Sequence, residues 1–288
     1  MQRRPSRLLA RALIAGLPAI ALALALGPAA GASTARPATA SPSAQAAATA
    51  RTALQHLSIG EHSADHRVSG PARKVSGLTQ VESSNWSGYA DTGSGFSKVT
   101  GSWTEPSVSC TRTTSLAAFW VGIDGYSSDS VEQDGTLAEC YDGTAYYYTW
   151  WEMYPTNDIQ VVGETLRPGD SISASVVRSG TSYTLKVTDS SRSADSFTTT
   201  QSCSSCANSS AEWIAEAPSG SSGVYPLAHF SSFSLSGATV TEGSTSGVIS
   251  SFTDDEITMV DSSGRVEAQP GSLNGSGNGF SVTWERST

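Results

Sequence analysis

Two glutamates four positions apart stand in the apolar stretch AEWIAEA, residues 211–217. Carboxylates are seldom buried unless they pair with another group or do chemistry. Pro218 and Gly220 follow closely, which favours a strand over a helix. In a strand, Glu212 and Glu216 share one side but stand roughly 13 Å apart, at about 3.3 Å per residue. Glycosidase carboxyl pairs are roughly 5–9.5 Å apart, so any catalytic partner must come from another strand.

A partner with suitable chemistry occurs in VEQDG, residues 131–135. The Gln133 side-chain amide can donate hydrogen bonds to a developing oxyanion, while a carboxylate removes a proton from water. One carboxylate and one amide are enough for water to attack a peptide carbonyl. Composition alone does not distinguish Gln133 from the other glutamines, for which a surface role is the ordinary expectation.

Two other peptidase chemistries lack their residues. A Ser/His/Asp triad needs a histidine base, and residues 81–288 contain only His229, with no G-x-S-x-G around a serine. We expect His229 to be a partly buried structural residue. The D-T-G at residues 91–93 copies the motif of pepsin-like enzymes, which need two aspartates. It occurs once here, and we interpret it as a turn.

Charge divides the chain into two parts. Residues 1–80 hold nine Lys/Arg and two Asp/Glu, whereas residues 81–288 hold eight and 24, a net charge of −16. Such a domain repels nucleic acid and anionic membranes. In acid its carboxylates would be protonated, and only eight Lys/Arg and His229 would carry positive charge. Repulsion between positive charges would then be weak, so the composition suits a protein that works in acid. An ordinary acidic secreted protein is the alternative.

The N-terminal part has the pattern of export and processing segments. Residues 1–32 combine an Arg-rich start, an Ala/Leu run and small residues, and they predict a secretory signal peptide. Residues 33–78, rich in Ala, Ser, Thr and Pro, predict a largely disordered pro-segment. Residues 79–288 then form one domain. We expect a secreted, extracellular protein with no membrane segment after signal removal.

Export makes disulfides the default for the four cysteines. Cys110 and Cys140 would close a loop of about 30 residues, and Cys203 and Cys206 could form a tight local bridge. The sequence does not fix this pairing. A structural zinc site is disfavoured because no second cysteine pair has metal spacing.

Strand patterns dominate residues 79–288, the region expected to remain after the signal peptide and pro-segment are removed. Apolar residues alternate in SISASVV (171–177), SYTLKVT (182–188) and GFSVTWE (279–285). Segments 117–123, 144–154 and 159–164 are rich in aromatic and β-branched residues, with turn residues between them. Short strands at this spacing predict an all-β, antiparallel sandwich.

Six segments, in order and spacing, resemble the glutamic peptidases, or eqolisins. They are SSNWSGY (83–89), GSWTEPSV (101–108), FWVGIDGY (119–126), VEQDG (131–135), YTWWEMYP (148–155) and AEWIAEAP (211–218). The resemblance implies a lectin-like sandwich of two antiparallel seven-stranded sheets. It also implies a secreted precursor and a pepstatin-insensitive acid endopeptidase with protein or peptide substrates. Nothing in the sequence indicates a metal or an organic cofactor.

Carried over by position, the family's catalytic dyad falls on Gln133 and Glu216, and Glu212 becomes a structural bystander. Residues that match substrate-binding positions of the family's cleft are Trp86, Trp120, Asp124, Trp150 and Glu152. For the tryptophans the alternative is core packing, and for Asp124 it is a turn. The chain departs from the family at residues 217–219 and at Tyr148, which leaves substrate preference and pH optimum open.

The same sequence features allow a different function, and the basic leader allows an internal partner for the acidic domain. A lectin-like sandwich with exposed tryptophans could instead be a glycoside hydrolase or a carbohydrate-binding module, with Glu132 or Glu139 meeting Glu216 across strands. The basic leader could cover the acidic domain at neutral pH and leave it in acid, or it could be an unstructured spacer. We expect a monomer.

Overall fold

The computed structural model describes residues 73–75, 78–220 and 222–288. These residues form strands and two single 3₁₀ turns, η2 (Ser193–Asp195) and η3 (Ile249–Ser251), and no α-helix occurs among them. The predicted all-β, antiparallel class is therefore confirmed. No helix in this part of the chain is long and apolar enough to cross a membrane. The proposed signal peptide and nearly all of the pro-segment lie outside the described residues.

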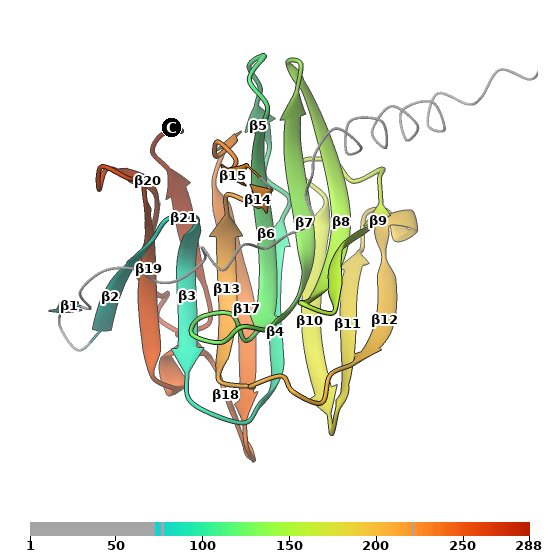
Figure 1. Ribbon diagram of the computed structural model, residues 1–288, viewed down its shortest axis with the longest axis vertical. Coiled ribbons are helices and arrows are strands. Elements are labelled where there is room, and N and C mark those ends of the chain that lie inside the picture. The colour runs from blue at the N-terminus through green and yellow to red at the C-terminus, as the bar shows by residue number, and fades with distance from the viewer. Residues whose placement is uncertain (1–72, 76–77, 221) are drawn as a thin grey trace, which may run out of the picture. The chain divides into compact units, whose positions relative to one another are not determined.

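The strands pair into one network with two arms (Figure 1). The first arm contains the site motifs, in the order β9-β8-β7-β6-β13-β3-β19-β2-β1. Its strands are β1 (Arg73–Val75), β2 (Leu78–Ser83), β3 (Trp86–Thr92), β6 (Ser115–Ile123), β7 (Val131–Tyr141), β8 (Thr144–Tyr154), β9 (Asn157–Gly163), β13 (Ser210–Glu216) and β19 (Asp254–Val260). All its pairs are antiparallel except β19 with β2.

The second arm runs β12-β11-β10-β4-β17-β21-β20, with β18 beside β17. Its strands are β4 (Phe96–Thr104), β10 (Ser171–Ser179), β11 (Ser182–Asp189), β12 (Phe197–Ser202), β17 (Phe233–Glu242), β18 (Thr245–Gly247), β20 (Val266–Pro270) and β21 (Phe280–Trp284). Two short ribbons complete the fold, β14 (Ser219–Gly220) with β15 (Gly223–Val224), and β5 (Val108–Ser109) with β16 (His229–Phe230).

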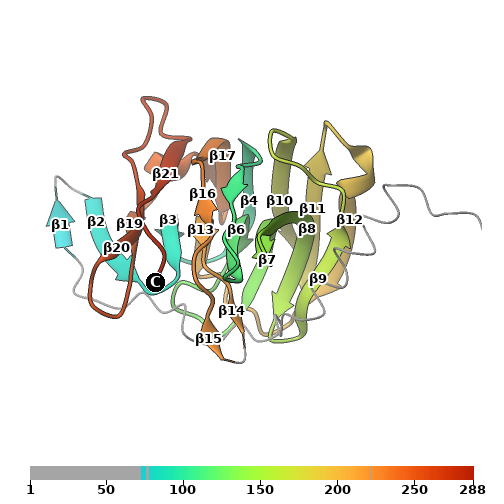
Figure 2. The same ribbon diagram turned by 90° about the horizontal axis from the view of Figure 1, so that it is seen from above.

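The resemblance implied two separate seven-stranded sheets, but the two arms are not separate sheets. The β19–β20 hairpin joins them, with pairs Met259–Ala268 and Val260–Val266, into a 17-stranded network. The hairpin is continuous in sequence, so its ladder connects the arms at one edge. In Figure 2, β17, β4 and β10 lie along one side of β13, β6 and β7.

The main hydrophobic core follows the predicted alternation. Ile172, Ala174 and Val176 of β10 are buried while their neighbours are more exposed, and β11 shows the same period. These side chains pack in one cluster with Phe119 and Val121 of β6. In a strand with one buried face, every second side chain is buried. The observed burial has this period, so the strand predictions for these segments are confirmed.

Two local expectations differ from the structure. His229 is exposed and stacks on Trp284, with ring centroids 3.9 Å apart, because the adjacent Phe230 takes the inward position of β16. Asp91 and Thr92 belong to β3 rather than to a turn, which begins at Gly93. Asp91 pairs directly with Asp254 of β19.

Both anticipated disulfides are present. Cys110 bonds Cys140 across 30 residues of chain, and Cys203 bonds Cys206 across three. No free cysteine occurs in the described part of the chain.

Candidate active site

Gln133 and Glu216 project from the same side of the first arm. Gln133 of β7 pairs with Gly122 of β6, and Gly122 pairs with Glu212 of β13. Directly paired residues project to one side, and every second residue along a strand does so too. Glu216 therefore shares this side with Gln133. We call it the site face: the side of β8, β7, β6, β13 and β3 that carries Gln133 and Glu216.

The strand register places Glu212, not Glu216, level with Gln133. Two strand spacings and four residues along β13 would separate the Cα atoms of Gln133 and Glu216 by about 16 Å on a flat sheet. The indole of Trp120 spans much of this interval. Its Nε1 donates to Glu216 Oε2 at 2.7 Å, and its Cζ3 lies 2.9 Å from where a Cβ on Gly122 would be. That Cβ position is 3.2 Å from the Gln133 Cβ.

Glu216 is buried among neutral hydrogen-bond donors. Besides Trp120, Asn85 donates from Nδ2 to Glu216 Oε1 at 3.2 Å. Asn85 is held in turn by Ser83, whose hydroxyl accepts from the Asn85 backbone N–H. Donors aimed at a carboxylate favour its ionised form and offset the cost of burial. The hydrogen bonds that a base working in acid needs are thus present at Glu216.

Gln133 is oriented by the strand beside it. Glu152 of β8 stands directly opposite, and the Gln133 Nε2 donates to Glu152 Oε2 at 2.6 Å. Both side chains are fully buried. Because the amide nitrogen carries two N–H groups, this bond fixes the amide plane and the direction of the second N–H. Glu152, predicted to bind substrate, is therefore placed to orient Gln133.

Glu212 has a different environment from Glu216. It is fully buried, and neither carboxyl oxygen accepts a hydrogen bond of good geometry, although Ser210 lies nearby. Burial, reinforced by the charges of Asp124 and Glu132, raises the pKa of Glu212 well above its ordinary value. Glu212 is consequently a neutral acid under acidic conditions and cannot serve there as a base.

The three predicted tryptophans are buried on the site face. Trp86 pairs with Glu216, and its ring meets that of Trp120 edge to face at 5.0 Å between centroids. Trp150 pairs with Gly135. Gly135 leaves room for Trp120, because a Cβ on residue 135 would lie 2.7 Å from the Trp120 Cβ. The three rings belong to a hydrophobic cluster separate from the main core.

Asp124 connects two loops. It has φ of 70° and is buried. Its carboxylate accepts hydrogen bonds from the backbone N–H groups of Asn208 and Ser209, at 2.7 and 2.8 Å, and from the Ser130 hydroxyl at 3.3 Å. It therefore fastens the loop after β6 to the segment that leads into β13.

The two other carboxyls considered for sugar chemistry lie on opposite sides of β7. Glu132 is adjacent to Gln133 and so projects away from the site face. Glu139 projects from the site face and accepts a hydrogen bond from Tyr148 at 2.8 Å. Burial raises the pKa of Glu139 to about 7. The idea that Glu132 meets Glu216 across strands is wrong, whereas Glu139 shares its side.

Sequence reasoning overlooked Asn85 and Gly122. Asn85 is the residue before Trp86 in SSNWSGY, so its position in that motif was the available signal. Gly122 lies inside FWVGIDGY, and its missing side chain makes room for Trp120 beside Gln133.

Comparisons with known proteins identify the family of the chain. Residues 84–282 match the model of the peptidase A4 family. Aspergillopepsin-2 of Aspergillus niger is 30% identical over 194 residues, covering 59% of this chain and 69% of that protein. Scytalidopepsin B of Scytalidium lignicola is 33% identical over 150 residues, covering 51% of this chain and 56% of that protein.

Solved structures show the same fold. Scytalido-glutamic peptidase, crystallised with a peptide-based transition state analogue, superposes with a TM-score of 0.60 at 24% identity, covering 70% of this chain and 98% of that one. Aspergilloglutamic peptidase from Aspergillus niger gives a TM-score of 0.51 at 27% identity, covering 59% and 99%. The resemblance found in the sequence is confirmed, and the chain belongs to the peptidase A4 family, the glutamic peptidases.

Proposed function

We propose that this protein is a secreted acid endopeptidase that hydrolyses peptide bonds with Gln133 and Glu216. The observation that carries the proposal is the contrast on β13. Glu216 receives hydrogen bonds from Trp120 and Asn85, whereas Glu212 receives none of good geometry and is neutral in acid. Membership of the glutamic peptidases supports the same reaction class.

In the proposed mechanism, ionised Glu216 removes a proton from a water molecule. The water oxygen attacks the scissile carbonyl carbon, and the carbonyl oxygen becomes an oxyanion. The second N–H of the Gln133 amide, whose plane is fixed by Glu152, donates to that oxyanion. Protonated Glu216 then gives its proton to the amide nitrogen as the carbon–nitrogen bond breaks.

The wider proposal concerns the fold and the precursor. The two arms would be the layers of a β-sandwich, with residues 79–288 as the peptidase domain, a monomer. The leader, residues 1–78, would hold the signal peptide and a pro-segment whose basic charge covers the acidic domain at neutral pH. Equal removal of residues 33–78 at pH 7 and pH 4 would count against that electrostatic release.

The test is hydrolysis of a denatured protein at about pH 3.5 with pepstatin present. Glu216→Gln should lower kcat on the order of 10²–10⁴-fold because the general base is lost. Gln133→Ala should lower kcat about 10²–10³-fold because an oxyanion donor is lost. Glu212→Gln, on the same strand and side, is the matched control. Folding of each variant is checked by tryptophan fluorescence.

Normal turnover by either purified dyad variant would refute the assignment. Cleavage of a glucan panel without cleavage of protein would instead favour a glycoside hydrolase, in which Glu139, rather than Glu132, shares the site face with Glu216. Sugar binding without either activity would indicate a carbohydrate-binding module.

A further inference from the structure

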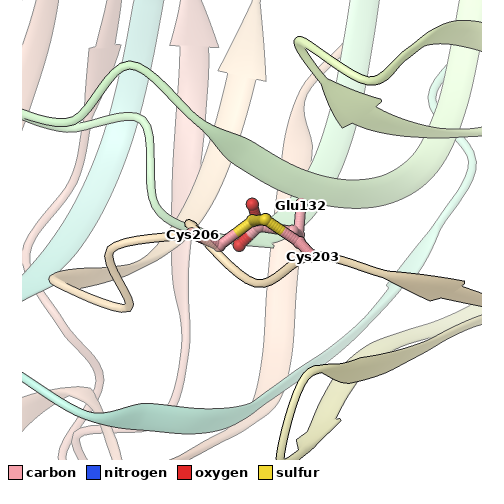
Figure 3. A group of neighbouring side chains, drawn as sticks. All are labelled: Glu132, Cys203 and Cys206. Atoms are coloured by element: carbon pink, nitrogen blue, oxygen red, sulfur yellow. A yellow bond between two sulfur atoms is a disulfide. The ribbon is translucent and has the colours of Figure 1, made fainter.

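The Cys203–Cys206 disulfide lies beside a buried carboxyl that the peptidase mechanism does not use. Both sulfur atoms and one carboxyl oxygen of Glu132 lie within 4.8 Å of one another. Figure 3 shows the Glu132 carboxyl directed at the sulfur–sulfur bond. Because the two sulfurs are bonded to each other, the three residues are not a metal site in this state.

The Glu132 carboxyl carries one proton next to the disulfide. It is fully buried on the side of β7 opposite Gln133, and neither of its oxygens accepts a hydrogen bond of good geometry, although Asp124 and Ser130 lie beside it. Burial, and then the charge of Asp124, raise the pKa of Glu132 to about 9. At neutral pH the carboxyl is therefore protonated and neutral.

The disulfide itself is reachable from solvent. Cys203 and Cys206 are half-buried, and Ser204 and Ser205 between them are exposed. The other disulfide differs in one residue: Cys110 is also half-buried, but Cys140 is fully buried in the main core. An attacking thiolate can thus approach the C-x-x-C bridge without unfolding the domain, whereas the Cys140 sulfur is shielded.

We propose that Cys203, Cys206 and Glu132 form a thiol–disulfide exchange site that takes a small dithiol as its reducing substrate. One thiolate of the dithiol attacks a cysteine sulfur, the Cys203–Cys206 bond breaks, and a mixed disulfide forms. The cysteine that leaves as a thiolate takes the proton of Glu132. The second thiolate of the dithiol then attacks the mixed disulfide, releasing the other cysteine and a cyclic disulfide.

The products balance the reactants. The dithiol is oxidised to a disulfide, the protein disulfide is reduced to two thiols, and both protons lost by the dithiol end on Cys203 and Cys206 once Glu132 regains its own proton from water. In the reverse direction Glu132, as a carboxylate, accepts a proton from a cysteine thiol. This site shares no residue with the proposed peptidase dyad, so the two proposals fail or succeed separately.

The experiment treats the full chain with dithiothreitol, quenches by alkylation and maps alkylated cysteines by peptide mass. Cys203 and Cys206 should be reduced in the folded protein well before the Cys110–Cys140 bond. At pH 7, Glu132→Gln should slow that reduction by about 10²-fold, the low end for a general acid. Asp134→Asn, a buried carboxyl two residues along the same side of β7, is the matched control and should react like the wild type.

A pH series on the wild type provides a second reading that does not depend on a variant folding. After division by the thiolate fraction of dithiothreitol, the rate should fall as pH passes through about 9, where Glu132 ionises. The charged or titratable groups around Glu132 are Asp124, Arg178, Tyr183 and Glu212. A normalised rate that stays flat from pH 6 to pH 10 would overturn the proposal, as would equal rates for wild type and Glu132→Gln at pH 7.

Discussion

Replacing Glu105 by Gln should stabilise the protein at neutral pH and hardly change it in acid. Glu105 follows β4, is 2% exposed, and accepts a long hydrogen bond of 3.4 Å from Trp103 Nε1. Burial is the main reason that its pKa rises from 4.5 to about 8. The hydrogen bonds from Thr136 and Trp103 lower the pKa but do not cancel the effect of burial.

The sign and size follow from proton linkage. Above pH 4.5 the unfolded chain releases the Glu105 proton, while the folded protein keeps it until about pH 8. The folded state then binds more protons, so the free energy of unfolding falls by about 1.4 kcal/mol per pH unit, or about 3 kcal/mol between pH 4.5 and pH 7. This stability is fully present below pH 4.5 and is lost as pH rises.

Glutamine keeps the shape of protonated glutamate and has no proton to lose. The difference in unfolding free energy between Glu105→Gln and wild type should therefore increase by about 3 kcal/mol from pH 3.5 to pH 7. Urea unfolding followed by tryptophan fluorescence at both pH values measures it. The exposed Glu285→Gln serves as control and should show little change. The same difference at both pH values, or a smaller one at pH 7, would refute the linkage.

Three further predictions concern the site face. Glu212→Gln should retain activity within a few-fold at pH 3.5, measured as kcat, because it replaces a neutral acid by a neutral amide. Glu152→Gln should lower kcat more than it changes KM, because an amide replaces the carboxyl that accepts from the Gln133 amide at 2.6 Å; unchanged kcat would mean that Gln133 needs no such support. Gly135→Ala should destabilise the fold by about 1–3 kcal/mol in urea unfolding, since its Cβ would lie 2.7 Å from that of Trp120, and wild-type stability would contradict this.

The sequence predicted the strands well because their signal is local. In β10 and β11 every second residue is apolar, and the pattern itself shows which side is buried. Pairing between strands carries no such local signal. Nothing in VEQDG or AEWIAEA states that Gln133 lies level with Glu212, or that a short hairpin from β19 to β20 joins the two arms.

Side-chain partners were harder still to predict. The motifs identified Gln133, Glu152 and Glu216 as important, but the hydrogen bond between the first two depends on the β7–β8 register. Asn85 donates to Glu216 from just outside β3, although 131 residues separate them in the chain. The expectation for His229 was wrong: it was expected to be partly buried, yet its side chain points outward from the two-residue strand β16.

Cross-strand neighbours explain why two glutamates on one side of β13 behave differently. Glu212 stands in mid-strand between Ala90 and Gly122, neither of which has a side-chain donor, and the backbone N–H groups around it are used in the ladder. Its carboxyl therefore keeps its proton. Glu216 is the last residue of β13, where the ladder ends and Asn85 can reach it from the start of β3, and where Trp120 directs its N–H. The position in the strand, rather than the type of residue, decides which glutamate can act as a base.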